Sequence, residues 1–165
     1  DAEQEMARNA ARLVVAKRKE SQRYIDPFDL SGLNPSEIKR IKKDTHAYGG
    51  ELAFRKLFEL PAYISPNPDK IDVMLQIGVG VDIKATEYID GVLAKMCLPW
   101  FDPTHPPDYY ALMVGKFPVY RYAGCMRGRE LIRDARYRAK YKNWPTPAWI
   151  AQQHELVFYF EKWGD

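Results

Sequence analysis

The chain has 165 residues, of which 46% are hydrophobic and 28% are charged, the balance of an ordinary soluble domain. This composition excludes a disordered or fibrous protein, and no apolar run is long enough to span a membrane. The net charge is only +3, which is mild for a protein whose whole surface binds nucleic acid. We expect one domain folded around a hydrophobic core.

Prolines mark the expected helix starts along the chain. Pro35, Pro68, Pro107 and Pro147 are each followed three residues later by a large apolar residue, as in the first turn of a helix. The first 34 residues are predicted to form a charged N-terminal helix and a connector, followed by a repeat domain over 35–165. The expected helices cover 2–24, 36–48, 50–60, 69–79, 83–97, 107–116, 118–141 and 147–161.

Apolar spacing and internal similarity favour a helical repeat. Tyr88, Val92, Leu93 and Met96 recur at the spacing of one helical face. The region after Gly49 also aligns with the region after Gly128, including their proline turns. The predicted fold class is all-α: a short α-solenoid of about seven or eight helices, arranged as hairpins of about 33–40 residues.

Motifs for catalysis, metals and nucleotides are missing from the sequence. Cys97 and Cys125 form no CxxC pair, and the three histidines fit no zinc-binding pattern. The segment 78–80 lacks the third glycine of a dinucleotide-binding loop and is interpreted as a turn between helices. Nothing favours Asp82 over the many other carboxylates as a catalytic group. We therefore predict no catalytic site, no metal and no cofactor, with both cysteines packed in the core.

The segment 116–142 carries the strongest local charge. Its nine basic residues against two acidic ones give +7, and tyrosines are interleaved among them. Arginine and stackable rings together are typical of an RNA-binding surface. A solvated helix with inward-facing tyrosines, or a surface for an acidic protein partner, would have the same pattern.

The segment from Gly128 to Ile150, which passes through Pro145 and Pro147, resembles the pentatricopeptide repeat family. The resemblance extends over 35–161 as about three degenerate units. It implies an α-solenoid, commonly organellar and often RNA-binding. A small chain of this repeat type is also similar to the extra subunit on the mitochondrial F1-ATPase of trypanosomes and other euglenozoans.

That similarity implies a non-catalytic accessory subunit of a mitochondrial ATP synthase. It would lie in the matrix, peripheral to the inner membrane, on the outside of the catalytic head and in contact with the F1-ATPase alpha subunit. Tryptophan and arginine dominate interface energetics, so they are the expected anchors. The partner-binding candidates are Trp100, Arg133, Arg136, Trp149 and Trp163. The alternative function is an organellar RNA-binding or mitoribosomal protein that uses the basic segment 116–142 as a helix.

Overall fold

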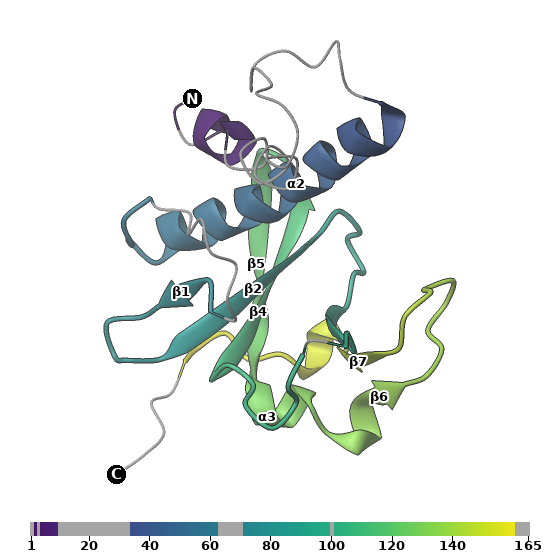
Figure 1. Ribbon diagram of the computed structural model, residues 1–165. Coiled ribbons are helices and arrows are strands. Elements are labelled where there is room, and N and C mark those ends of the chain that lie inside the picture. The colour runs from purple at the N-terminus through teal and green to yellow at the C-terminus, as the bar shows by residue number, and fades with distance from the viewer. Residues whose placement is uncertain (1, 3, 10–33, 63–70, 100, 161–165) are drawn as a thin grey trace.

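The computed structural model describes residues 2, 4–9, 34–62, 71–99 and 101–160. A four-stranded sheet lies at the centre, a long helix crosses one face, and a small three-stranded sheet packs on the other side (Figure 1). The predicted all-α solenoid and the pentatricopeptide resemblance are therefore wrong, because this part of the chain contains seven strands in two sheets. The fold is a mixed α/β domain.

Helix α2 (Pro35–Leu57) begins where the sequence predicts a helix start. Asn34 caps it: the Asn34 Oδ1 atom accepts the backbone N–H of Glu37 at 3.1 Å, and the Glu37 carboxylate accepts the backbone N–H of Asn34 at 3.0 Å. The helix continues without interruption, so the two helices predicted between 36 and 60 are one. Residues 4–9 are also helical, and the rest of the predicted N-terminal helix lies outside the described residues.

The central sheet has the strand order β1-β2-β4-β5. β2 and β4 run parallel to each other, whereas the β1–β2 and β4–β5 pairs are antiparallel. The four strands are β1 (Val73–Met74), β2 (Gly80–Thr86), β4 (Tyr109–Lys116) and β5 (Val119–Arg127).

The second sheet has the order β3-β7-β6 and is antiparallel throughout. Short helical turns join it to the central sheet and to the C-terminal segment. Its strands are β3 (Leu93–Met96), β6 (Tyr137–Arg138) and β7 (Ala148–Ala151), and the turns are α3 (Gly128–Leu131), η1 (Asp134–Arg136) and η2 (Gln153–Glu155).

Strand β4 separates two hydrophobic cores. Tyr109, Ala111 and Met113 pack toward α2, and the alternate residues Tyr110 and Leu112 pack toward the small sheet. Both faces of β4 are therefore buried, which produces a nearly continuous apolar run in the sequence. This explains why a helix was wrongly predicted at 107–116. The free thiol of Cys125 lies in the α2 core, and that of Cys97 packs against the other.

The remaining helix predictions fail in the same way. The segment 83–97 contains the end of β2, a loop and β3, and the segment 118–141 contains β5, α3, η1 and β6. The segment 147–161 begins with β7. The described part of the segment 69–79 contains β1 and the turn of the β1–β2 hairpin, where Gly78 has a φ of 75°, so neither the helix nor a turn between helices is present there. Short apolar runs rich in Val, Ile and Tyr fit strands at least as well as helices. Among the described helices, none has the length and apolarity needed to cross a membrane.

Candidate functional site

Helix α2 comes into close contact with strand β2 at Gly50. A Cβ atom on Gly50 would lie only 2.8 Å from the Cβ of Ala85, so only glycine permits this approach without displacement. The next residue, Glu51, is half-buried beside the same part of β2. The glycine therefore explains how a helix on one face of the sheet brings a carboxylate to the edge of β2.

Asp72 immediately precedes strand β1. β1 pairs with β2 only at Val73 and Met74. Next to this short ladder, the Asp72 side chain forms a hydrogen bond to β2. The Asp72 Oδ2 atom accepts the backbone N–H of Ile83 at 2.5 Å. From α2, the Arg55 Nη2 atom donates to the Asp72 carbonyl at 2.7 Å. Asp72 is thus fixed to both β2 and α2, with its carboxylate at the open edge of the sheet.

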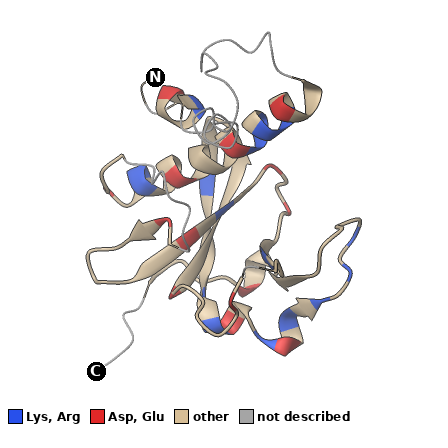
Figure 2. Cartoon of the chain, in the orientation of Figure 1, with Lys and Arg blue, Asp and Glu red and all other residues tan. Residues whose placement is uncertain are grey.

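Strand β2 contributes an aspartate and a lysine on one face. Val81 and Ile83 point into the α2 core, so the alternating residues Asp82 and Lys84 point the other way. Asp82 is only 5% exposed, and its Oδ1 atom is in contact with the Lys84 ammonium group. The Lys95 ammonium group from β3 lies 3.8 Å from Asp82 Oδ2. Figure 2 shows the adjacent acidic and basic positions along β2.

Glu51, Asp72 and Asp82, here called the carboxylate cluster, repel one another electrostatically. Burial and the negative charge of Asp72 raise the pKa of Glu51 to about 8. Burial and the neighbouring Asp82 carboxylate raise the pKa of Asp72 to about 6. Buried like charges disfavour ionisation, so the cluster costs folding free energy at neutral pH. Such groupings are characteristic of functional sites.

Two lysines face the carboxylate cluster with opposite electrostatic balances. Burial disfavours the charge of Lys84, but Asp82 and Asp72 outweigh it and raise the pKa of the ammonium group. Burial and the nearby Lys84 charge lower the pKa of Lys95. Lys84 is therefore held as a cation, whereas Lys95 is the lysine that more readily loses its proton.

The hydroxyl of Tyr110 adds an unsatisfied polar atom to the site. Tyr110 is fully buried, and its hydroxyl has no hydrogen-bond partner. The Lys84 and Lys95 ammonium groups lie 5.9 and 6.0 Å from the centroid of the Tyr110 ring. Burial, together with the negative charge of Asp82, raises the pKa of this tyrosine. A buried hydroxyl without a partner beside charged groups indicates room for a polar ligand or water.

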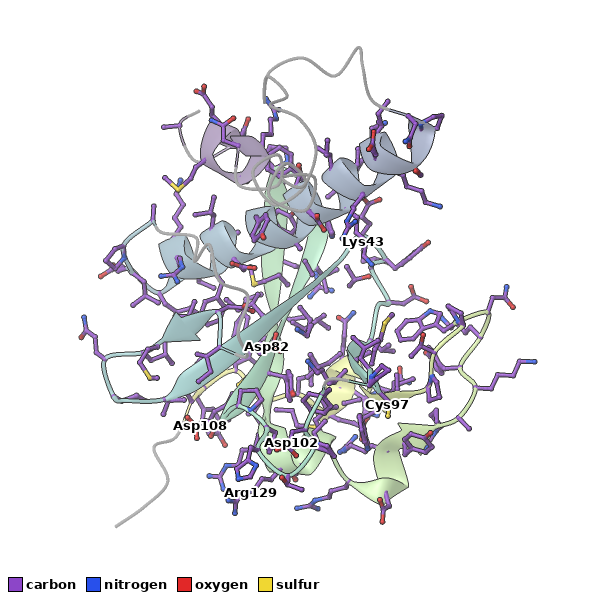
Figure 3. All side chains as sticks on the ribbon, viewed as in Figure 1. Lys43, Asp82, Cys97, Asp102, Asp108 and Arg129 are labelled. Atoms are coloured by element: carbon purple, nitrogen blue, oxygen red, sulfur yellow. The ribbon has the colours of Figure 1, made fainter. Side chains whose placement is uncertain are left out.

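A cleft of about 840 Å³ opens beside Lys84 and Lys95, and we call it the central cleft. Its volume lies within the roughly 300–1,000 Å³ of ligand-binding sites. Helix α2, the loop after β2, strand β3 and the β6–β7 loop form its walls, and Figure 3 labels Lys43 on α2 and Asp82 on β2. The polar and aromatic residues lining it are Lys43, Lys84, Thr86, Tyr88, Asp90, Lys95, Tyr141, Lys142, Asn143 and Trp144.

Three of the partner-binding candidates predicted from the sequence are not in the lining of the central cleft. Trp149 is buried in β7, where its ring packs on Phe101 and Tyr137 with centroid distances of 5.7 Å. Arg136 donates to the Glu155 carboxylate at 2.8 Å, and Arg133 is exposed at the start of η1. Trp149 is therefore a core residue. The two other candidates, at positions 100 and 163, lie outside the described residues.

The sequence analysis missed the carboxylate cluster and Lys84. The available signal was the alternation of Asp82 and Lys84 with Val81 and Ile83, which has the period of a strand. Glu51 and Asp72 join them only through the tertiary fold. The chain matches no known protein family, no curated protein and no solved structure. A function must therefore be inferred from the site itself.

Proposed function

We propose that this protein is a nuclease that depends on a divalent cation, with its active centre at the carboxylate cluster. The observation that carries the proposal is the grouping of Glu51, Asp72 and Asp82 with Lys84 at the open edge of β2, beside a lysine-rich cleft. Three mutually repelling carboxylates do not stabilise a fold. A cation held by two of them would favour the ionised forms of all three.

Magnesium is the cation whose chemistry fits best. Within the described residues, no group of three or more histidine, cysteine, aspartate or glutamate side chains is arranged to hold a metal ion. Mg²⁺ does not require one, because it is usually bound by one or two carboxylates, several waters and the phosphates of the substrate. Asp72 and Asp82 are the expected ligands because their carboxyl groups are within hydrogen-bonding reach of each other. The unpartnered hydroxyl of Tyr110 fits a hydrated ion nearby.

The residues around the cluster have distinct tasks in phosphodiester cleavage. The cation would act as a Lewis acid on a phosphoryl oxygen and promote ionisation of a water. Lys84 remains charged and is placed to stabilise the negative charge that develops on the phosphate, or to orient the attacking water. Glu51, whose pKa is raised to about 8, is mostly protonated at neutral pH; a bound cation would favour its ionised form, which would then accept a proton from the attacking water. Arg55 positions Asp72 through the backbone.

The central cleft favours a nucleic acid over a small phosphate ester. Four lysines and one aspartate line it, so its walls attract a chain of phosphates. Tyr88, Tyr141 and Trp144 also line it, and aromatic rings stack on nucleobases. A simple phosphatase has no use for aromatic rings along an extended cleft.

Cleavage of labelled DNA and RNA by the full chain tests this proposal. We expect cleavage with Mg²⁺ and no cleavage with EDTA, because the carboxylates alone provide no Lewis acid. Asp72→Asn should remove the activity while retaining a folded protein, since the amide is isosteric. Failure of the wild-type chain to cut any nucleic acid, or full activity of Asp72→Asn, would contradict the proposal.

The earlier functional predictions are not tested by these findings. The accessory subunit of F1-ATPase and the mitochondrial location stay predictions, and so does the alternative RNA-binding or mitoribosomal role. The helical repeat on which the F1-ATPase similarity rested is contradicted by the two sheets. The basic segment that was predicted to be an RNA-binding helix is mostly strand β5 and the turns after it.

A further inference from the structure

The loop after β2 presents two large apolar side chains to solvent. Tyr88 is 74% exposed and Ile89 is 79% exposed, at adjacent positions of a loop whose Tyr88 lines the central cleft. Single exposed apolar residues are ordinary on a protein surface. An adjacent pair at the mouth of a charged cleft is better explained by a contact with a ligand.

Hydrogen bonds fix this loop in place. The Gln153 Nε2 atom donates to the carbonyls of Ile89 at 2.9 Å and Gly91 at 2.7 Å. The Arg121 Nη2 atom donates to the same Ile89 carbonyl at 3.3 Å, and the Gly91 N–H donates to the Tyr88 carbonyl at 2.9 Å. The exposed pair is therefore held outward before any ligand binds, and such preorganisation lowers the entropic cost of binding.

A second aromatic group lies on the β6–β7 loop. The rings of Tyr141 and Trp144 meet edge to face with centroids 5.2 Å apart, and both residues line the central cleft. Lys142 lies between them in the sequence, with its ammonium group 5.4 Å from the Tyr141 ring centroid. The cleft thus has stacking surfaces on two walls, with lysine ammonium groups beside them.

The combination of rings and lysines distinguishes single-stranded from double-stranded nucleic acid. A duplex offers phosphates to a protein surface, but its bases are already stacked on one another and their faces are inaccessible. An unpaired strand offers both phosphates for the lysines and free base faces for the rings. An acidic peptide would use the lysines but would leave most of the aromatic surface without a matching face.

We propose that the central cleft binds an unpaired strand of DNA or RNA, with Tyr88 on one wall and Trp144 on the other stacking against its bases. Ile89 extends the apolar tip beside Tyr88. The substrate class of the proposed nuclease is then single-stranded or locally unpaired nucleic acid. The cleavage part of this inference rests on the proposed function, whereas the binding part does not require it.

Binding of the full chain to a fluorescent oligothymidylate of about 12 nucleotides tests the inference, within the site sizes of single-strand binders. The measurement is made in EDTA, so that cleavage does not consume the probe. Tyr88→Ala and Trp144→Ala should each weaken binding by about 5- to 100-fold, the range expected for loss of one stacked base. Tyr159→Ala is the matched control, because Tyr159 is 60% exposed but is not in the cleft lining.

The outcomes separate the two proposals. Tyr88 is exposed, so Tyr88→Ala leaves the core intact. If this variant bound the oligonucleotide as tightly as the wild-type chain, the inference would be overturned. Equal or tighter binding of a duplex of the same length would also overturn it. Tight, ring-dependent binding by a protein that cleaves nothing would uphold the inference and overturn only the nuclease proposal. Cleavage of duplex and single strand at equal rates would uphold the nuclease and overturn the inference.

Discussion

A single aspartate, Asp102, and the carboxylate cluster show opposite shifts of carboxyl pKa. In the exposed loop after β3, Asp102 accepts hydrogen bonds from the Thr104 backbone N–H at 2.9 Å and the Thr104 hydroxyl at 2.6 Å. The His105 ring lies 2.8 Å away. These donors hold the pKa of Asp102 well below its usual range. In the carboxylate cluster, burial and like charges instead raise the pKa of Asp72 and Glu51.

The difference distinguishes a structural carboxylate from a functional one. Hydrogen-bond donors of its own loop stabilise the ionised form of Asp102, so this carboxylate requires no bound cation. In the carboxylate cluster, burial and the neighbouring carboxylates keep the pKa values of Glu51 and Asp72 raised despite Lys84, so a cation bound beside them would favour their ionised forms.

The largest expected effect is on catalysis. Asp82→Asn should lower the rate of Mg²⁺-dependent cleavage by about 100- to 1,000-fold or more, because it removes both a ligand charge and the partner of Lys84. Asp102→Asn, the same chemical change in the exposed loop, should leave the rate unchanged. Rates on a labelled oligonucleotide measure both. Comparable losses of cleavage rate in the two variants would show that Asp82 and Asp102 do not differ in function.

Gly50→Ala should act through the position of helix α2. The added Cβ would lie 2.8 Å from the Cβ of Ala85, so we expect about 1–3 kcal/mol of destabilisation and a loss of cleavage as Glu51 moves away. Gly78→Ala is the control: it strains a turn with a φ of 75° but touches nothing within 4 Å. Urea unfolding and cleavage assays should show both variants destabilised and only Gly50→Ala inactive.

The pH dependence of stability should also identify the cluster. With its pKa raised from 4.5 to about 8, Glu51 binds more protons in the folded state than in the unfolded state across this range. The free energy of unfolding of the metal-free protein should therefore fall as pH rises from about 4.5 to about 8. Glu51→Gln should make this decrease in the free energy of unfolding smaller. Melting temperatures recorded in EDTA across this pH range measure the decrease in both proteins.

The pKa of Asp102 is shifted in the opposite direction, so its contribution to the pH dependence of stability has the opposite sign. Its lowered pKa contributes stability that is present at neutral pH and is lost only as the solution becomes strongly acidic. Asp102→Asn should therefore leave the fall between pH 4.5 and 8 unchanged. A metal-free wild-type protein whose stability rises over that range would show that Glu51 is not held protonated by its surroundings.

The smallest expected effect concerns Arg136, a residue predicted from the sequence to bind a partner. Its guanidinium group bonds the Glu155 carboxylate and the Glu130 carbonyl, both on the chain itself. Arg136→Ala should cost about 0.5–1 kcal/mol of stability and leave cleavage intact. Arg133→Ala, at an exposed neighbouring position, should change neither. Loss of cleavage in Arg136→Ala would place the η1 turn in the functional site.

The local part of the fold was predictable, and the long-range part was not. Pro35 with its capping residues specifies a helix start through contacts within four residues, and the structure confirms it. Strand β4 was mistaken for a helix because residues buried on two faces lack a clear period. In the segment 83–97, the helical spacing of Tyr88, Val92, Leu93 and Met96 runs across a loop and strand β3, and Tyr88 is exposed. The carboxylate cluster forms because helix α2 crosses β2 and because the Asp72 side chain, just before β1, bonds to β2. The spacing of Glu51, Asp72 and Asp82 in the sequence predicts neither contact.

Calorimetric titration of the full chain with MnCl₂ or MgCl₂ near pH 7 tests the central claim most directly. Carboxyl groups whose pKa values are raised to about 8 and about 6 must give up protons when a cation binds. Measured in buffers of different ionisation enthalpy, wild-type binding should release about one proton per ion, Glu51→Gln should release fewer, and Asp82→Asn should bind far more weakly. The absence of binding, or binding that Asp82→Asn leaves unchanged, would contradict the account.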